Sequence, residues 1–464
     1  MFKIPRRIDD LLPADTVQRM LDAIHSGDIA TSVREVMGKV GVKDLRPIEK
    51  MQAAWQQTRS WLDSISGDTV RDSVQSTINA TGQLFGPGFC NVPLASVVGY
   101  GYAKSAMAFQ SGDQVLSRAQ LIGRKCLGCS HVVWLTGASA AIRLLAQSLE
   151  IEEVLIARTD LIRIDNFGDI GQLLAFSGIP VTEVGASNGN TIEDWKRSLT
   201  SSRQLVLHVS PNGLEQEEAA KQRSRASHLA REIGATTVEL LIDGVASSAL
   251  AEQFRFPLIK EHLQDPAAIA IVPLNFLLGG PAGVFVAGNN PALEQIQQNA
   301  GSIGVATMGP TLVASTTALQ LSSLGDELEA AATADLCINP DNLRDRAKRL
   351  SIQLDGVNAV SSATVVARSV ELGPSPWHRY RHDSWAVQLL PKHSVSELTQ
   401  LLAKGKLGPP IFAASSDQHV LLDLRFVPPS LDHELVNAIV APTEERKESS
   451  AETSPAAPSS HNNS

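Results

Sequence analysis

Short, unbroken runs of apolar residues, separated by stretches of helical pattern, constrain the fold of this chain more than any other feature. Such runs are typical of strands whose two faces are both buried. They lie within residues 132–135, 154–157, 204–209, 239–243, 268–272 and 283–287, of which 204–209 and 239–243 also contain polar residues. Because helical stretches alternate with them, we predict an α/β fold with a mainly parallel sheet covered on both faces.

The chain of 464 residues is too long for one small core, and its pattern divides it into four segments. Residues 1–75 have apolar side chains at helical spacing and are predicted to form an N-terminal helical domain. Residues 76–330 carry the α/β pattern, and residues 331–441 are predicted to form a smaller α+β domain. Residues 442–464 are rich in Ser, Glu, Pro and Asn, and we expect them to form a disordered tail.

The charge and composition limit the function classes. The formal charge of −9 would repel a phosphate backbone on average, which weakens a nucleic-acid role without excluding it. No apolar run approaches the roughly 18 residues of a membrane span, and the basic N-terminus is not followed by the apolar core of a signal peptide. The four cysteines form no dense framework. We therefore expect a cytoplasmic protein without a membrane partner.

Five strings, in order along the chain, carry a resemblance to a known family. They are Thr-Ile-Asn-Ala-Thr-Gly at 77–82, Ser-Gly at 177–178 leading to the strand and turn 181–185, Leu-Leu-Gly-Gly-Pro at 277–281, Ser-Trp-Ala-Val at 384–387 and Leu-Asp-Leu-Arg at 422–425. Together they resemble bacterial selenocysteine synthase (L-seryl-tRNA selenium transferase), in which the second string belongs to a central strand. The resemblance implies the aspartate-aminotransferase-like fold type I, a homodimer or higher homo-oligomer, pyridoxal phosphate as cofactor and tRNA as partner.

A pyridoxal site needs an acid for the pyridine nitrogen and a helix N-terminus for the phosphate. Asp243 stands where the family's acid-bearing strand ends; the alternative is a solvated aspartate that opens a turn. Gly137, Ala138 and Ser139 follow a strand and open a helix, so their N–H groups could bind the phosphate. The alternative there is an ordinary turn with a serine cap. Both cofactor-binding assignments are implied by the resemblance.

The cofactor lysine is missing from this chain. In the family, Asp-Lys directly precedes Leu-Leu-Gly-Gly-Pro, and here Asn275 and Phe276 hold those two positions. A phenyl ring has no nitrogen with which to form a Schiff base. The nearest upstream lysine, Lys260, lies 16 residues away on a predicted helix. We therefore assign no catalytic residue, and we expect no bound cofactor unless another lysine reaches the site.

Other departures affect basic side chains of the family. The His and Arg that follow the first family string are absent from residues 86–91, and Asp169 aligns with an arginine. The family's His-Thr-Ser-Asn loop reads Ser-Pro-Asn-Gly at 210–213, and a glycine-rich stretch is replaced by residues 377–382. Loss of the lysine together with these partners suggests that the ancestral reaction has been abandoned.

Three smaller signals have ordinary alternatives. Cys126 and Cys129 form a CxxC pair without a second pair nearby, so we interpret them as buried thiols. His378 and His382 have the spacing of a helical metal pair, but flanking prolines argue against a helix, and no metal site is predicted. Residues 377–381 mix basic and aromatic side chains that could clamp RNA; the alternative is an exposed loop.

Two functions remain in competition. The first is a degenerate member of the family that keeps the fold, has lost Schiff-base catalysis and acts as a binding or regulatory pseudoenzyme. The second is an active pyridoxal-phosphate transferase that converts seryl-tRNA to selenocysteinyl-tRNA, or a related small-molecule lyase. Phe276 favours the first, and the order of the motifs supports the second.

Overall fold

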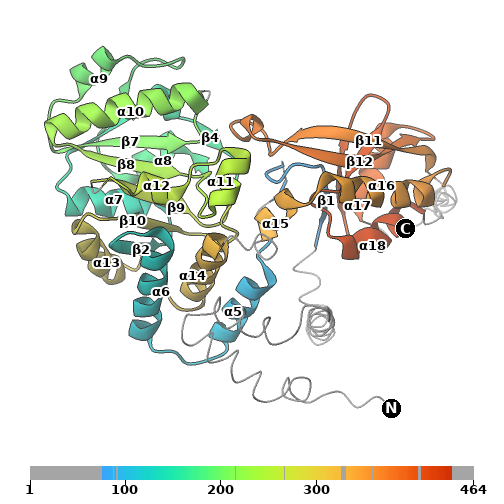
Figure 1. The fold of residues 1–464 in the computed structure, drawn as a ribbon, viewed down its shortest axis with the longest axis horizontal. Helices are drawn as coiled ribbons and strands as arrows, with labels where there is room; N and C mark the ends of the chain where they lie inside the picture. Colours follow the sequence, from blue (N-terminus) through green and yellow to red (C-terminus); the bar gives the residue numbers. More distant parts are fainter. Residues whose placement is uncertain are drawn as a thin grey trace, which may run out of the picture. The chain divides into compact units, whose positions relative to one another are not determined.

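The computed structural model describes residues 76–440 except 87, 90–91, 215, 266, 325–330, 358 and 406–408. The predicted N-terminal helical domain and the predicted tail lie outside the described residues. The described chain forms two compact units (Figure 1). The large unit contains Leu84–Cys337 and Glu371–His382, and the small unit contains residues 76–83, Ile338–Val370 and 383–440.

The large unit is built on a seven-stranded sheet with the order β2-β10-β9-β8-β7-β3-β6. The strands are β2 (His131–Leu135), β3 (Glu153–Ala157), β6 (Val181–Val184), β7 (Gln204–Ser210), β8 (Thr236–Leu241), β9 (Ile269–Pro273) and β10 (Val284–Gly288). Neighbours from β6 to β9 pair in parallel, whereas β10 is antiparallel to both β9 and β2. Every residue of β7, β9 and β10 is buried, so the predicted sheet and its burial are confirmed.

Helices cover both faces of this sheet (Figure 1). The helices of the large unit are α5 (Ser96–Ala106), α6 (Gly112–Leu127), α7 (Ala138–Ser148), α8 (Ile170–Ser177), α9 (Ile192–Ser198), α10 (Gln216–Ile233), α11 (Ser248–Phe254), α12 (Ile259–His262), α13 (Ala292–Ser302), α14 (Gly309–Leu324) and α15 (Ala331–Cys337). Leu127 of α6 and Leu319 of α14 pack with Trp134 and Phe285 on one face. Helix α7 buries Ala138, Ala141, Ile142 and Leu145, a helical spacing that seats one apolar stripe against the sheet.

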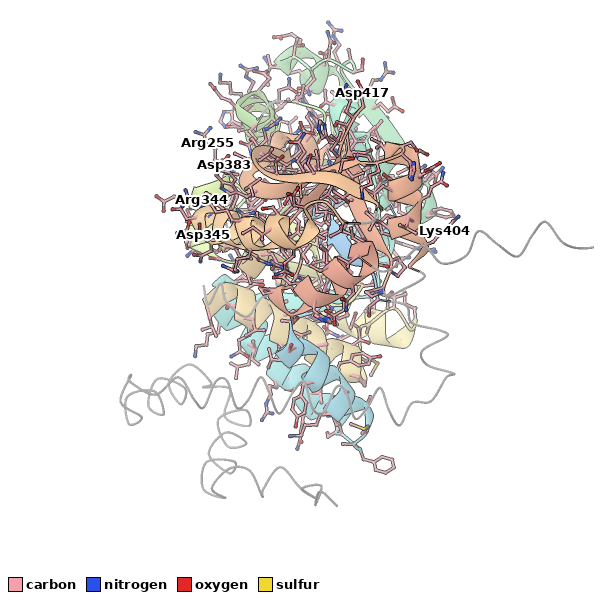
Figure 2. The ribbon with its side chains drawn as sticks, turned by 90° about the vertical axis from the view of Figure 1, so that its right-hand side faces the viewer. Arg255, Arg344, Asp345, Asp383, Lys404 and Asp417 are labelled. Atoms are coloured by element: carbon pink, nitrogen blue, oxygen red, sulfur yellow. The ribbon has the colours of Figure 1, made fainter. Side chains whose placement is uncertain are left out.

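The small unit has a five-stranded sheet with the order β1-β13-β14-β12-β11. Its elements are β1 (Ile78–Ala80), α16 (Pro340–Leu354), β11 (Val360–Glu371), β12 (Arg381–Pro391), α17 (Val395–Lys404), β13 (Ile411–Ser415), β14 (Val420–Asp423) and α18 (Asp432–Val440). Apolar side chains of the three helices and the sheet form one core. On α16 the half-buried Arg344 pairs with Asp341 and Asp345, and Figure 2 shows Arg344 and Asp345 on the surface.

Three features differ from the sequence-based expectations. Strand β1 belongs to the small unit because it pairs in parallel with β13, although residue 76 was the predicted start of the large domain. Residues 371–382 pack in the large unit, although the predicted domain boundary at 330/331 puts them in the smaller domain. Strand β6, expected to be central, is the edge strand of its sheet.

Within the described part of the chain, no helix has the length and apolar character needed to cross a bilayer.

Candidate functional site

Asp243 lies two residues beyond the C-terminal end of β8, the edge at which α/β sheets place ligands. Its side chain is fully buried. One carboxylate oxygen, Oδ2, accepts a hydrogen bond from Ser210 Oγ (3.1 Å) and another from the hydroxyl of Tyr380. The other oxygen has no hydrogen-bond partner among the described residues. The alternative of a solvated aspartate is therefore wrong, because the carboxylate is held inside the large unit.

Burial controls the protonation of the Asp243–Tyr380 pair. It raises the pKa of Asp243, while the hydrogen bonds from Tyr380 and Ser210 act in the opposite direction. Burial and the neighbouring carboxylate raise the pKa of Tyr380 well above its ordinary value. The phenol therefore keeps its proton and remains the donor in this hydrogen bond.

Phe276 follows β9 and is 1% exposed. Its ring stacks on Trp377 with the centroids 5.6 Å apart and lies 5.5 Å from the ring of Phe85. The turn after it is closed by hydrogen bonds from Gly279 N to Phe276 O (3.0 Å) and from Gly280 N to Leu274 O (2.8 Å). A Cβ on Gly280 would come within 3.1 Å of Leu274 Cβ. The Leu-Leu-Gly-Gly-Pro string thus forms a tight turn at the end of a buried strand.

Five rings form what we call the aromatic cluster, and each of them is 4% exposed or less. Its members are Phe85, Phe256, Phe276, Trp377 and Tyr380. The closest pair is Phe85 and Trp377, with centroids 4.1 Å apart, and Phe256 lies 4.6 Å from Tyr380. The cluster therefore connects Phe276 to the residue that binds Asp243.

Residues 377–381 form neither a fully exposed loop nor an open RNA clamp, although His378 and Arg381 are exposed. Trp377–Arg379 is a short 3-10 helix, η3, and Trp377 and Tyr380 are buried. Arg379 Nη2 donates to the carbonyl oxygens of Asn212 and Leu214. Rings and a guanidinium that already have partners inside the protein are unavailable for stacking on bases. His382, which has helical spacing to His378, is also buried, and no cluster of three or more metal-ligating side chains occurs among the described residues.

The first turn of α7 keeps its backbone donors uncapped. Gly137 is the N-cap residue, and no side chain caps the helix, so the serine cap given as the alternative is not formed. Ser139 Oγ instead donates to Leu173 O (3.1 Å), and Ala138 is buried. A Cβ built on Gly137 would meet nothing within 4 Å. Among the described residues, the contacts that link Phe276 to Asp243 do not include this turn.

Two cysteines of the CxxC pair flank the end of α6. Gly128 ends that helix in the left-handed conformation, and both thiols are free. Burial raises the pKa of Cys126 and that of Cys129. The protonated thiol is a poor nucleophile and metal ligand. The interpretation as buried thiols holds for Cys129, whereas Cys126 is half-buried.

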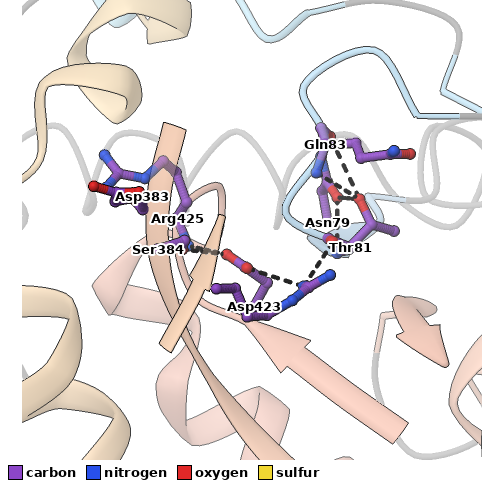
Figure 3. A network of polar contacts seen from close by, with 8 residues as sticks. Asn79, Thr81, Gln83, Asp383, Ser384, Asp423 and Arg425 are labelled. Carbon is purple, nitrogen blue, oxygen red and sulfur yellow. Dashed lines mark hydrogen bonds and ion pairs between the residues drawn. The ribbon is translucent and has the colours of Figure 1, made fainter. Parts of the chain in front are cut away.

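Three of the family strings meet in the small unit, at the buried Asp423. Asp423 Oδ1 accepts from Ser384 Oγ (2.6 Å) and from Arg425 N (3.1 Å), and Oδ2 accepts from Arg368 Nη1 (3.0 Å). Arg368 Nη1 also donates to Thr81 O (3.2 Å). Figure 3 shows Asp423 between Ser384 and the turn that contains Asn79, Thr81 and Gln83.

Gly82 shows why the first string ends in glycine. Its φ is +84°, and an added Cβ would lie 2.7 Å from the carboxyl carbon of Asp423. A side chain would therefore be strained by both the backbone and the space. The strings at 77–82, 384–387 and 422–425 hold the small unit together, and sequence reasoning had not assigned them this role.

A second buried polar group lies around Asp160, next to a cavity of about 10 Å³, which has room for one water molecule. The Asp160 carboxylate accepts from Val209 N (2.9 Å) and Asn212 Nδ2 (2.9 Å). Burial nevertheless raises its pKa to about 6. His208, which also lines the cavity, has its pKa lowered by burial to about 4. No pattern in the sequence predicts this group, because its members come from separate strands and loops.

The raised pKa of Asp160 predicts a pH dependence of stability. The folded state holds the proton more tightly than the unfolded chain, so this contribution is present at low pH and is lost as the pH rises through about 6. A shift from 3.8 to about 6 corresponds to about 3 kcal/mol. Relative to Asp160→Asn, the wild type should lose that amount between about pH 4 and about pH 7. Urea unfolding of both proteins across this range tests it, and parallel stability curves would contradict it.

The sheet order, the helices on both faces and the separate five-stranded unit define an α/β protein of the pyridoxal-phosphate transferase class, fold type I. The solved structure of D-glucosaminate-6-phosphate ammonia-lyase superposes with a TM-score of 0.58 over 80% of this chain and 96% of that one, at 15% identity. That likeness shows the shared fold.

The model of the L-seryl-tRNA selenium transferase (SelA) family matches residues 111–428, and the chain belongs to this family. The L-seryl-tRNA(Sec) selenium transferase of Mannheimia succiniciproducens is 25% identical over 299 residues, 62% of this chain and 64% of the relative. The match thus spans less than two thirds of that relative. The enzyme of Moorella thermoacetica is 23% identical over 80% of this chain and 82% of its own.

Family and fold imply pyridoxal phosphate as cofactor, but the residues at the site do not fit it. The position of the Schiff-base lysine holds a buried phenyl ring, and one oxygen of the carboxylate that would pair with the pyridine nitrogen already accepts a hydrogen bond from the Tyr380 hydroxyl. Lys260 is no substitute at this site, because its Nζ donates to Ser248 Oγ (2.9 Å) in an exposed contact. No catalytic step through the cofactor follows from these residues.

Proposed function

We propose that this chain is a selenocysteine-synthase-like protein that has lost pyridoxal Schiff-base catalysis and serves a binding or regulatory role in the cytoplasm. One observation carries the proposal: Phe276, at the lysine position, is packed in the aromatic cluster next to Trp377. The lysine of such an enzyme holds the cofactor, exchanges it with the substrate and moves the proton. Its loss removes the covalent catalyst itself, so a small adjustment of neighbouring groups cannot restore the reaction.

The remaining site residues support the same proposal. Asp169, at a position where the family has an arginine, caps α8 by accepting from Gln172 N (3.0 Å). Asn212 lies in the loop that replaces His-Thr-Ser-Asn. Its side-chain amide donates to Asp160, and its backbone carbonyl accepts a hydrogen bond from Arg379. These side chains are engaged in structural contacts, and Asp169 adds a negative charge where the family has a positive one.

Treatment with pyridoxal phosphate followed by borohydride tests the proposal. We expect no absorption band of a Schiff base beyond that of surface lysines, and no site-specific cofactor mass after reduction, because no amine lies in the aromatic cluster. Intact mass and peptide mapping of the reduced protein give the measurement, and Lys260→Arg is the matched control. A stoichiometric cofactor mass on a single lysine would overturn the proposal and restore the transferase reading.

Two partner proposals accompany this function. A homodimer or larger homo-oligomer is supported by large apolar side chains exposed on and after α5, namely Val97, Tyr100, Tyr102, Met107 and Phe109. A tRNA partner is supported by the names of the relatives, L-seryl-tRNA(Sec) selenium transferases. Light scattering of the purified chain, alone and with seryl-tRNA, measures both; a monomer unaffected by the RNA would sink both proposals.

A further inference from the structure

The segment that joins β11 to β12, residues 372–380, packs between the two positions on which a pyridoxal site depends. A pyridine ring joined to position 276 and paired through its nitrogen with Asp243 would have to lie between these residues. Trp377 stacks on Phe276 (5.6 Å), and Tyr380, whose ring lies 6.4 Å from that of Trp377, donates to Asp243. Side chains of the protein thus connect both ends of the site.

The backbone fixes this segment in place. Phe85 N donates to Leu372 O (2.8 Å), and Leu372 N donates to Tyr380 O (2.9 Å). A Cβ on Gly373 would lie 2.8 Å from Phe85 O, so the segment approaches its neighbour as closely as only glycine allows. Arg379 is held by the carbonyls of Asn212 and Leu214. Hydrogen bonds at both ends of the segment therefore hold Trp377 and Tyr380 in place.

We infer that residues 372–380 are a built-in occupant of the ancestral cofactor site, with the Trp377 indole and the Tyr380 phenol excluding any pyridine ring from the space between Phe276 and Asp243. This inference rests on the proposed function, since it assumes that these two positions once served a cofactor. The chain itself closes the site, so two features prevent cofactor binding: the missing lysine and the two rings that fill the space.

Two buried polar atoms next to the segment lack hydrogen-bond partners. This is expected if residues 372–380 replaced a cofactor, filling its space without satisfying every polar group there. Trp377 Nε1 and Asp243 Oδ1 are buried, and neither has a hydrogen-bond partner among the described residues. Removal of the two rings would leave Asp243 with Ser210 as its remaining side-chain donor. The trimmed site would then offer a carboxylate and an apolar slot, which suit a protonated pyridine.

Pyridoxamine phosphate is the probe, because it has the cofactor ring but no aldehyde and cannot form a Schiff base with any lysine. Binding is measured by calorimetry for the wild type, the double variant Trp377→Ala/Tyr380→Ala and the control Trp195→Ala. Trp195 is equally buried but contacts Asn190 and His208 instead of the aromatic cluster. We expect the double variant to bind at least about tenfold more tightly than the other two proteins, a gain of about 1.4 kcal/mol.

Wild-type binding as tight as that of the double variant would overturn the inference, as would a folded double variant without any gain. If the double variant does not fold, hydroxyl-radical labelling of the wild type decides: Trp377 should be as protected as Trp195, and labelling as fast as that of the exposed Phe109 would overturn the inference. A Schiff base trapped on the wild type refutes the proposed function, whereas these binding and labelling results bear on the occupant alone.

Discussion

Replacing Asp423 with alanine should lower the free energy of unfolding by about 3–5 kcal/mol, because it removes one partner of a buried charge network. Asp423 is fully buried and accepts from Ser384, Arg425 N and Arg368. Without the carboxylate, the Arg368 guanidinium keeps only the Thr81 carbonyl among these contacts, and the Ser384 hydroxyl loses its acceptor. Unsatisfied buried donors account for most of the expected loss.

The measurement is urea unfolding followed by circular dichroism, with hydrogen exchange of the β14 amides to assign the change to the small unit. Asp417→Ala is the matched control, because Asp417 is an exposed aspartate on the neighbouring turn (Figure 2). Surface substitutions of this kind usually change stability by less than about 0.5 kcal/mol. A loss below about 1 kcal/mol for Asp423→Ala would show that the network contributes little.

Much of the large unit follows from the sequence, because continuous apolar runs have few other solutions than strands buried on both faces. The run at 204–209 lies in β7 and the run at 268–272 overlaps β9, and every residue of these two strands is buried. Edge position was harder to predict. Strand β6 has exposed residues at Val181 and Glu183, but alternation within four residues does not distinguish an edge strand from a half-covered central one.

Only part of the candidate site could be predicted from the sequence. Phe276 could be predicted to lack Schiff-base chemistry, because a residue type alone decides whether a nitrogen is present. The position of residues 377–381 in the fold could not be predicted, because a run of Trp, His, Arg and Tyr suits an exposed binding loop as well as a buried turn. Tyr380 and Arg379 are held by acceptors on Asp243 and Asn212, which lie more than a hundred residues earlier in the chain.

The family strings also had two meanings that the sequence could not separate. Strings in the same order as in an enzyme family could mark a retained active site or a retained scaffold. Three of them converge on Asp423 in the small unit, and Leu-Leu-Gly-Gly-Pro forms the turn after β9. The resemblance is therefore carried largely by residues that hold the fold, which is why it persists beside a phenylalanine at the lysine position.

Restoring the lysine alone should fail for the same physical reason. In Phe276→Lys, an ammonium group would replace a ring that is 1% exposed and packed against Phe85 and Trp377. Burial of the charge and loss of the ring's packing should together cost about 3–5 kcal/mol, even after some cation–π attraction. Phe276→Leu keeps the site apolar and should cost only about 1–2 kcal/mol, which makes it the control for lost volume.

The pH dependence separates the charge from the volume. Burial lowers the pKa of the introduced lysine below its unfolded value, so the Phe276→Lys protein should gain stability as the pH rises toward about 10, while Phe276→Leu should not. Urea unfolding at neutral and alkaline pH gives both values. Pyridoxal phosphate and borohydride should still leave no cofactor on the introduced lysine while Trp377 and Tyr380 fill the space beside it. A trapped cofactor in this single variant would mean that the rings move aside, and the built-in occupant would then be no barrier.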